Sequence, residues 1–387
     1  MAACSVWPPS DQRSKVIRAA AAAPLDWNRF LRVVARHRVV GLAHDGLSRA
    51  RPNVPAPIAR ELAERAAALV QQSLLIAAES ARLQGLFAQA DLPLIFLKGA
   101  SLAILAYGSV GLRQSEDIDL LVPYETLPAA TALLTRAGYR RFDPPNDISD
   151  PQLRLIMSLR KDLGFVHEAT RQRIELHWRL FLNPHAMDEA SMMRSCQTVR
   201  LTAAMTLRTL NDEDLFAYLC MHGALHWWNR LQWLADINAL LSRAPEDGVQ
   251  SIMSAAETRG VGRAVAQALL LCQRLLATPL PARLTVELAK SLTLRWLETT
   301  ALRAMTCGKG ELEPHEARFG TTRGSLSTFL LKRSWRYRLS ELNTHLTTET
   351  DILAMPLSAR TRLLYPILRL PLWAWRHAAK RGIKGTL

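Results

Sequence analysis

The chain has 387 residues, of which 49% are hydrophobic and 21% are charged, so it is a folded protein and not a disordered one. No apolar run approaches the length that spans a bilayer, and no basic-then-apolar leader opens the chain, so we expect a cytoplasmic protein without a transmembrane segment. The formal net charge of +15 favours an acidic partner. An arginine-rich composition set by genomic base bias explains the charge equally well, because arginine is spread along the whole chain.

The predicted elements run from helical to mixed and back to helical. Residues 10–90 show helical periodicity, with a proline-containing linker at 51–57 and a long helix from about 58 to 90. The next segment predicts a strand at 92–97, a helix at 100–107, a strand over 117–122, a helix at 125–137 and a short strand near 139–142. A loop at 143–151, rich in Pro, Asp and Asn, is expected to be a mobile flap. Two alternating segments at 163–168 and 173–179 predict an antiparallel hairpin.

Nearly everything from about residue 186 onward is predicted to be helical, with a break near 308–324. The predicted fold is therefore an α/β (α+β) core with a mixed sheet, flanked by N-terminal helices and a mainly helical C-terminal region. We divide the chain into a helical region (1–90), a mixed core (91–185), a helical domain (186–310) and a basic helical C-terminal region (311–387). Within the last, residues 360–384 predict either a packed helix with a basic outer face, which we favour, or a segment lying on an anionic surface. Five scattered cysteines without C-x-x-C spacing fit reduced thiols.

An aspartate pair is the most informative feature of the predicted core. Asp117 and Asp119 lie within an apolar run, and strand alternation directs both carboxylates to one face while Ile118 points to the other. Neighbouring carboxylates on a core strand repel each other unless a hard cation such as Mg²⁺ binds them. The alternative is a solvated turn pair, which the flanking apolar residues argue against. The pattern therefore predicts a metal site.

A phosphate cradle is predicted just upstream. The first strand stops at Gly99, and a helix start presents free backbone N–H groups that suit a phosphate. Gly99 permits close backbone approach, Ala100 follows it, and Ser101 offers a hydroxyl. Lys98 either reaches a phosphate or extends its ammonium from the strand end towards water.

Arg113 and Ser115 precede the aspartates in a predicted loop. The guanidinium fork suits triphosphate oxygens, and the Ser115 hydroxyl either binds a phosphate or caps the turn. The alternative for Arg113 is a salt bridge that orients Asp117, Asp119 or Glu116.

The motif Lys98-Gly99-Ala100-Ser101, followed by Arg113-x-Ser115-x-Asp117-x-Asp119, resembles the nucleotidyltransferase superfamily typified by DNA polymerase β. It is more closely similar to a bacterial branch of largely uncharacterised nucleotidyltransferase-like proteins, which share this core and a later ELHW strand, here residues 175–178. The resemblance covers roughly residues 70–245. Ala100 departs from it, because the family has a second glycine or a serine at that position.

The resemblance implies a metal-dependent nucleotidyltransferase that uses Mg²⁺ or Mn²⁺. Asp117 and Asp119 would hold the ions, and Glu175 would be a third carboxylate that binds the metal activating the acceptor hydroxyl or acts as its base. The donor would be an NTP, with ATP favoured, and the acceptor a small molecule, protein or RNA. The alternatives are a catalytically weak or inactive nucleotide-binding or antitoxin-like protein of the same fold, a nucleic-acid-binding protein, and a structural helical scaffold. The alternative for Glu175 is that it is an ordinary exposed glutamate on a strand, without a role in the site.

Four further polar residues are candidate accessory groups. His177 shares a strand face with Glu175, so it either lies beside the metals or caps the edge of the site. His222, His226 and Arg230 are spaced four apart and are predicted to share one helical face. They form either a structural network, perhaps with Asp236, or the wall of a cleft that faces the nucleotide. A zinc site is disfavoured because the H-E-x-x-H pattern is missing.

Overall fold

The computed structural model describes residues 1–245, 248–317, 320–347 and 368, and its centre is a seven-stranded sheet. The strands lie in the order β3-β4-β5-β2-β1-β7-β6. Two pairs, β2–β5 and β1–β7, are parallel and the other pairs are antiparallel, which confirms the predicted mixed sheet. Their bounds are β1 Ile95–Phe96, β2 Asp117–Leu121, β3 Tyr139–Asp143, β4 Asp162–His167, β5 Arg173–His177, β6 Cys196–Arg200 and β7 Thr206–Leu210.

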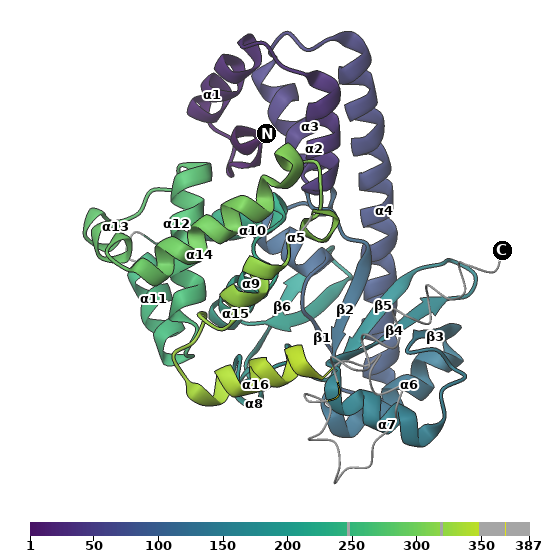
Figure 1. Cartoon of the computed structure of the whole chain (residues 1–387). Helices are drawn as coiled ribbons and strands as arrows, with labels where there is room; N and C mark the ends of the chain where they lie inside the picture. The colour runs from purple at the N-terminus through teal and green to yellow at the C-terminus, as the bar shows by residue number, and fades with distance from the viewer. Residues whose placement is uncertain (246–247, 318–319, 348–367, 369–387) are drawn as a thin grey trace, which may run out of the picture.

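One long helix joins the N-terminal helices to the sheet (Figure 1). Helices α2 (Trp27–Arg36) and α3 (Val40–Ala50) pack against α4, which runs over Ala56–Gln89, and α1 (Asp11–Ala22) packs on α3. The 34 residues of α4 begin just after Pro55, with Pro57 in the first turn, where a missing N–H costs no helical hydrogen bond. The second half of α4 contributes Leu83 and Phe87 to the core beneath the sheet.

The two faces of the sheet differ in chemistry. Ile118 and Leu120 of β2, with Ile174 and Leu176 of β5, pack into the core that α4 and α6 (Leu127–Arg136) cover. Because side chains alternate along a strand, the odd-numbered residues of β2 and β5 face the other way. The predicted hairpin is confirmed as β4 and β5, and the helix predicted at 100–107 is α5 (Ala100–Tyr107).

The prediction that residues beyond 186 are helical is wrong for one segment. Strands β6 and β7 form a hairpin there, and β7 pairs in parallel with β1 through Phe96 and Thr209. The Thr209 hydroxyl donates a hydrogen bond of 2.6 Å to the Phe96 carbonyl. The boundary at 185 thus falls between strands of one sheet, and we propose that the catalytic unit extends to about residue 210. The strand predicted at 92–97 is also shorter, because only Ile95–Phe96 pair as β1.

Most of the remaining helices lie to the left of the sheet in the view of Figure 1, whereas α7 (Asp150–Leu159) lies below it. The others are α8 Glu189–Met192, α9 Asp212–Leu225, α10 Leu231–Leu241, α11 Gly248–Thr258, α12 Gly262–Leu276, α13 Ala282–Ala289, α14 Leu292–Met305, α15 Thr322–Thr328 and α16 Trp335–Leu346. The predicted loop at 143–151 leads into α7, and its mobility stays a prediction. The break predicted near 308–324 lies between α14 and α15. No helix in the described part of the chain combines the length and apolar character needed to cross a bilayer.

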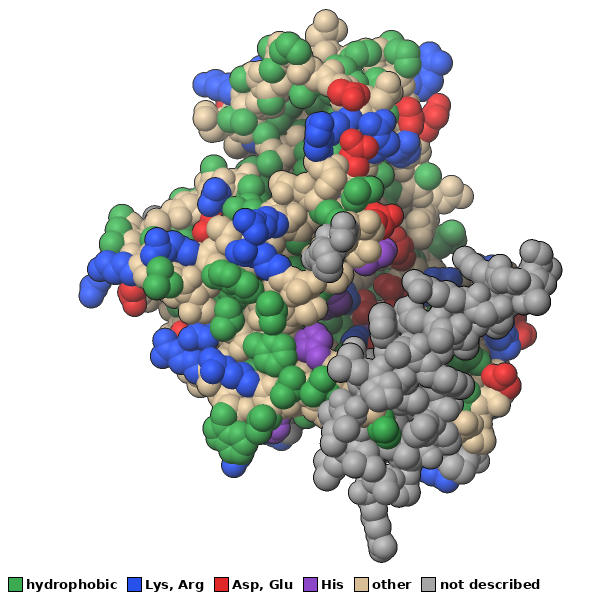
Figure 2. Space-filling view, in the orientation of Figure 1, with side chains coloured by type: hydrophobic (Ala, Val, Ile, Leu, Met, Phe, Trp, Pro, Cys, Tyr) green, Lys and Arg blue, Asp and Glu red, His purple; other side chains and the backbone are tan. Residues whose placement is uncertain are grey.

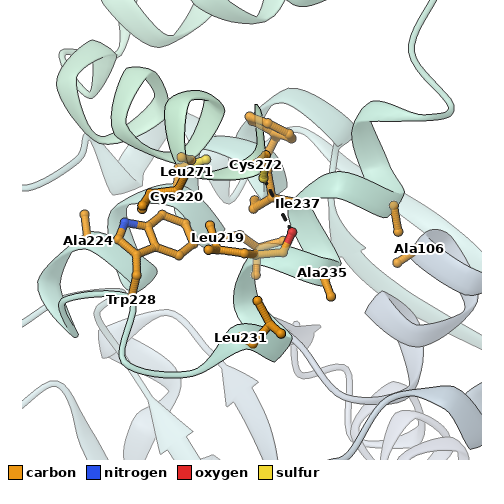
Figure 3. Packing of buried hydrophobic residues seen from close by; sticks show 14 of the residues in the cluster. Ala106, Leu219, Cys220, Ala224, Trp228, Leu231, Ala235, Ile237, Leu271 and Cys272 are labelled. Carbon is orange, nitrogen blue, oxygen red and sulfur yellow. Dashed lines mark hydrogen bonds between the residues drawn. The ribbon is translucent and has the colours of Figure 1, made fainter. Parts of the chain in front are cut away.

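The core of the helical domain is built by α9, α10 and α12. Figure 3 shows the Trp228 ring beside Cys220 and Leu271, with Ile237 and Cys272 next to them. The five cysteines all lie in the described part of the chain, and none forms a disulfide there. The segment 360–384 lies outside the described residues except for position 368, so both predictions for it remain untested.

Candidate metal and nucleotide site

Strand register brings the predicted acidic residues to one place. In the parallel β2–β5 pair, Asp119 lies opposite Glu175 and Leu121 lies opposite His177. In the antiparallel β4–β5 pair, Asp162 lies opposite His177. The polar residues of three adjacent strands therefore meet on the sheet face that is turned away from α4.

Asp119, Glu175 and His177 form a group that fits a metal ion. Each offers one ligand atom, and these atoms all lie within 4.8 Å of one another. The Nε2 atom of His177 lies 3.4 Å from Oδ1 of Asp119 and 3.4 Å from Oε2 of Glu175. Asp119 and His177 are buried, whereas the Glu175 side chain is 41% exposed. Two carboxylates and an imidazole are ordinary ligands of divalent ions, so these residues fit the cation that the fold implies.

Asp117 lies at the start of β2, outside that group of three. Burial and the nearby charge of Asp119 together raise its pKa to about 6, while Lys98 opposes the shift. A carboxyl with a raised pKa in a polar hollow is typical of functional sites. The structure thus divides the predicted aspartate pair: Asp119 joins Glu175 and His177, and Asp117 stands next to them.

Lys98 makes an ion pair inside the site, which neither of its two predicted roles included. Its Nζ atom lies 3.1 Å from Oδ1 of Asp119. Burial opposes the charged form of Lys98, but Asp119 and the neighbouring carboxylates outweigh it and raise the pKa of the lysine. Burial likewise opposes ionisation of Asp119, yet Lys98 and His177 hold the pKa of this aspartate well below its usual range. Lys98 is therefore a counterion of the metal-ligand candidate Asp119.

The turn after β1 has the geometry expected of a phosphate cradle only in part. Gly99 caps α5 with a φ of +75°, a conformation that favours glycine, and no atom beyond its chain neighbours lies within 4 Å of the place that a Cβ would take. Ala100 and Ser101 are buried in the first turn of the helix. The Ser101 hydroxyl donates a 3.1 Å hydrogen bond to the Lys98 carbonyl, so it supports the turn and does not face the hollow.

Arg113 and Ser115 interact with other side chains of the protein. The Arg113 side chain is 5% exposed, and its Nε lies 3.0 Å from Oδ2 of Asp236 on α10. A second nitrogen of Arg113 donates to the Ser115 hydroxyl at 3.0 Å, and the Tyr107 hydroxyl donates to Oδ1 of Asp236 at 2.9 Å. Burial raises the pKa of Asp236, and Arg113 opposes that shift. The predicted ion pair of Arg113 thus exists with Asp236 and not with Asp117, Asp119 or Glu116, and it fixes the loop before β2.

Arg230 does not share a helical face with the two histidines, contrary to the prediction. Helix α9 ends at Leu225, and Trp227 and Trp228 follow with φ values of +59° and +50°. This left-handed turn breaks the helical repeat. Arg230 lies 3.0 Å from Oε1 of Glu313 and stabilises a loop of the C-terminal region.

His222 and His226 instead form an aromatic group with Trp233 and Tyr218. The ring centroids of the two histidines lie 4.6 Å apart, and those of Trp233 lie 5.3 and 5.6 Å from them. The His222 side chain is half-buried and the His226 side chain is exposed. Figure 2 shows acidic and histidine side chains together in a hollow near the middle of the drawn face.

Lys161 and Asp162 were missed by the sequence analysis. Oδ2 of Asp162 lies 3.6 Å from Nδ1 of His177, and Nζ of Lys161 lies 2.6 Å from the same carboxylate oxygen. In the hairpin Val166 lies opposite Arg173, and counting four residues back on β4 and four residues forward on β5 aligns residue 162 with 177. The predicted strand began one residue too late to include Asp162.

The mixed sheet, the strand-turn-helix after β1 and the acidic group on β2 and β5 define a nucleotidyltransferase-like α/β protein. A family model described as an uncharacterised nucleotidyltransferase matches residues 23–277, more than half of the chain, so the protein belongs to this family. None of the curated proteins matches the chain. Membership supports a transferase with an NTP substrate, and the group of two carboxylates and one histidine suggests a divalent metal.

Proposed function

We propose that the protein transfers a nucleoside monophosphate from an NTP to a hydroxyl acceptor and releases pyrophosphate. The observation that carries the proposal is the β2–β5 register, which aligns Asp119 with Glu175 beside the turn at Gly99. Family membership supports the same reaction class. ATP is the donor we favour, and the acceptor is a small molecule, protein or RNA.

In this proposal Asp119 and Glu175, with Asp117 beside them, hold Mg²⁺ or Mn²⁺. The bound ion supplies Lewis-acid stabilisation of the charge that develops on the phosphates and on the acceptor oxygen. The amides that follow Gly99 and the ammonium of Lys98 bind phosphate oxygens. Glu175, the most exposed carboxylate of the metal-binding group, accepts the proton of the acceptor hydroxyl. The acceptor oxygen then bonds to the α-phosphorus as the bond from that phosphorus to pyrophosphate breaks.

Arg113 has a supporting role in this proposal. Its pairing with Asp236 keeps it from the phosphates and anchors the loop that leads into Asp117. Gln114 is held in the same way, because its backbone N–H donates to the side chain of Gln232 and its carbonyl accepts from it. The start of β2 is thereby fixed on α10, which positions the carboxylates.

The Lys98–Asp119 pair favours one alternative, a protein of this fold that binds nucleotide without turnover. The partly exposed ammonium of Lys98, 3.1 Å from Asp119, already neutralises the carboxylate that a metal would use. Such a protein would be protected by nucleotide against thermal unfolding, yet it would release no pyrophosphate.

The test is transfer of label from α-labelled NTPs in the presence of Mg²⁺ or Mn²⁺ and a cell extract. We expect label on one class of acceptor together with pyrophosphate release, and loss of both in Asp119→Asn at unchanged helix content. Glu168→Gln, at an exposed site near the β4–β5 turn, is the matched control and should retain activity. Full activity in folded Asp119→Asn would refute the assignment. Nucleotide binding without pyrophosphate release would support the alternative.

A further inference from the structure

We propose that His177 is itself a metal ligand, so that the centre formed by Asp119, Glu175 and His177 prefers a divalent transition ion to Mg²⁺. This proposal extends the proposed function. It rests on that function only for the role of the bound ion in catalysis. Mg²⁺ is a hard ion that selects oxygen ligands, whereas imidazole nitrogen suits ions such as Fe²⁺, Co²⁺ and Zn²⁺. A histidine among the ligands therefore changes which metal the site selects.

Two distances within the group, both measured from Nε2 of His177, match a shared ion. Ligand atoms at about 2.1 Å from one ion lie about 3.0–3.4 Å from each other when the angles between them are about 90–110°. The Nε2 atom of His177 lies 3.4 Å from Oδ1 of Asp119 and 3.4 Å from Oε2 of Glu175. Both separations are long for a hydrogen bond and right for two ligands of the same ion.

Two buried atoms of the group lack hydrogen bonds among the described residues. They are Nε2 of His177 and Oδ1 of Asp119, on side chains that are 1% and 4% exposed. Oδ1 lies in the ion pair with Lys98, but the angles there do not form a hydrogen bond. Buried polar atoms of native proteins almost always have a partner. An ion between these two atoms would satisfy both.

The other side of the imidazole faces the ion pair of Lys161 and Asp162. Nζ of Lys161 lies 3.4 Å from Nδ1 of His177, Oδ2 of Asp162 lies 3.6 Å from it, and Lys161 lies 2.6 Å from that oxygen. Strand pairing fixes this arrangement, since Asp162 and His177 are register partners in β4 and β5.

Neighbouring histidines do not compete for this role. His222 and His226 contact each other and Trp233, and neither belongs to a metal-binding group in the described part of the chain. The geometry therefore selects one histidine, which is the one on the strand next to Asp119.

The experiment is metal binding to the full chain without nucleotide. Isothermal titration with Co²⁺ and with Mg²⁺ is compared among the wild type, His177→Gln and His185→Gln, a matched control that removes an exposed histidine. We expect one Co²⁺ site with at least tenfold higher affinity than for Mg²⁺. His177→Gln should lose at least tenfold in Co²⁺ affinity and less than threefold in Mg²⁺ affinity, and His185→Gln should match the wild type. Unchanged Co²⁺ affinity in His177→Gln, or equal affinity of the wild type for both metals, would overturn the proposal.

A second measurement needs no variant and therefore does not depend on folding of His177→Gln. Pulsed electron paramagnetic resonance of the Mn²⁺-loaded wild type should show coupling to one ligand nitrogen, and its absence would equally overturn the proposal. The outcomes separate the two claims. Nitrogen coupling without nucleotidyl transfer leaves the metal site standing and refutes the function. Nucleotidyl transfer with Mg²⁺ but without nitrogen coupling supports the function and refutes the metal site at His177.

Discussion

The buried pair of Arg113 and Asp236 gives the sharpest test of how the loop before β2 is held. The substitution Arg113→Met removes the cation and leaves Asp236, whose side chain is 1% exposed, with the Tyr107 hydroxyl as its remaining hydrogen-bond donor. Breaking a buried pair by removing one partner costs about 3–5 kcal/mol, because an uncompensated charge stays in the interior. Since both side chains are at most 5% exposed, solvent screening reduces this figure little.

The loss of unfolding free energy is expected to be smaller when both partners are removed together. Replacing a buried ion pair by apolar residues of similar volume is often nearly neutral. We therefore expect Arg113→Met combined with Asp236→Leu to cost clearly less than the sum of the two single losses, with a coupling of at least about 2 kcal/mol. The free energy of unfolding is measured in urea by circular dichroism and tryptophan fluorescence, and coincident transitions justify a two-state analysis.

The same variants decide between the positioning and phosphate-binding roles of Arg113. If the guanidinium positions the loop, Arg113→Met loses stability, and the double variant regains most of it. Additive losses in the cycle would refute this reasoning. So would a variant of unchanged stability that has lost only NTP affinity, since that result requires a free guanidinium facing the triphosphate.

Two further predictions concern buried charges. Burial and the charge of Arg36 lower the pKa of His37 to about 3. Below pH 6.5 the unfolded chain therefore binds a proton at His37, whereas the folded chain keeps this ring neutral until the pH approaches 3. Stability should fall by up to about 1.4 kcal/mol per pH unit as the pH drops from about 6.5 towards 3, and pH-dependent urea unfolding should show a shallower slope in His37→Gln. Lys98→Met leaves Asp119 without its ion pair and should cost about 3 kcal/mol in the metal-free protein, measured by the same unfolding assay. Divalent ions should restore most of the loss, and a variant as stable as the wild type without metal would contradict the counterion role.

The parts of the fold that sequence predicted are those set by local periodicity. The apolar spacing of α4 and the strand-turn-helix around Gly99 are local patterns, and both were confirmed within a few residues. Hairpin β6–β7 was missed because its short strands mix Thr, Gln and Arg with few apolar residues. Its place in the sheet depends on pairing with β1, about a hundred residues earlier in the chain.

In the candidate site too, local sequence patterns predicted some features, and pairing between distant segments determined the others. Strand alternation predicted that Asp117 and Asp119 share a face, and the motif pointed to Glu175. Only the β2–β5 register reveals that Asp119 meets Glu175 directly, and local patterns carry little information on pairing between distant strands. The partner of Arg113 lies 123 residues away, so no local pattern could distinguish Asp236 from the nearer acidic residues.

Lys98 lies between the metal-binding group and the turn at Gly99. This position explains why it has been assigned both an ion pair with Asp119 and a phosphate contact. In the metal-free protein its ammonium balances Asp119 at 3.1 Å. A divalent ion bound to the same carboxylate repels that ammonium, since like charges a few ångströms apart in a poorly screened hollow cost several kcal/mol. Lys98 directly precedes Gly99, so its side chain starts next to the amides after Gly99 that we propose bind phosphate. We therefore expect metal binding to release Lys98 towards the triphosphate, which makes the buried ion pair and the phosphate contact successive states of one residue.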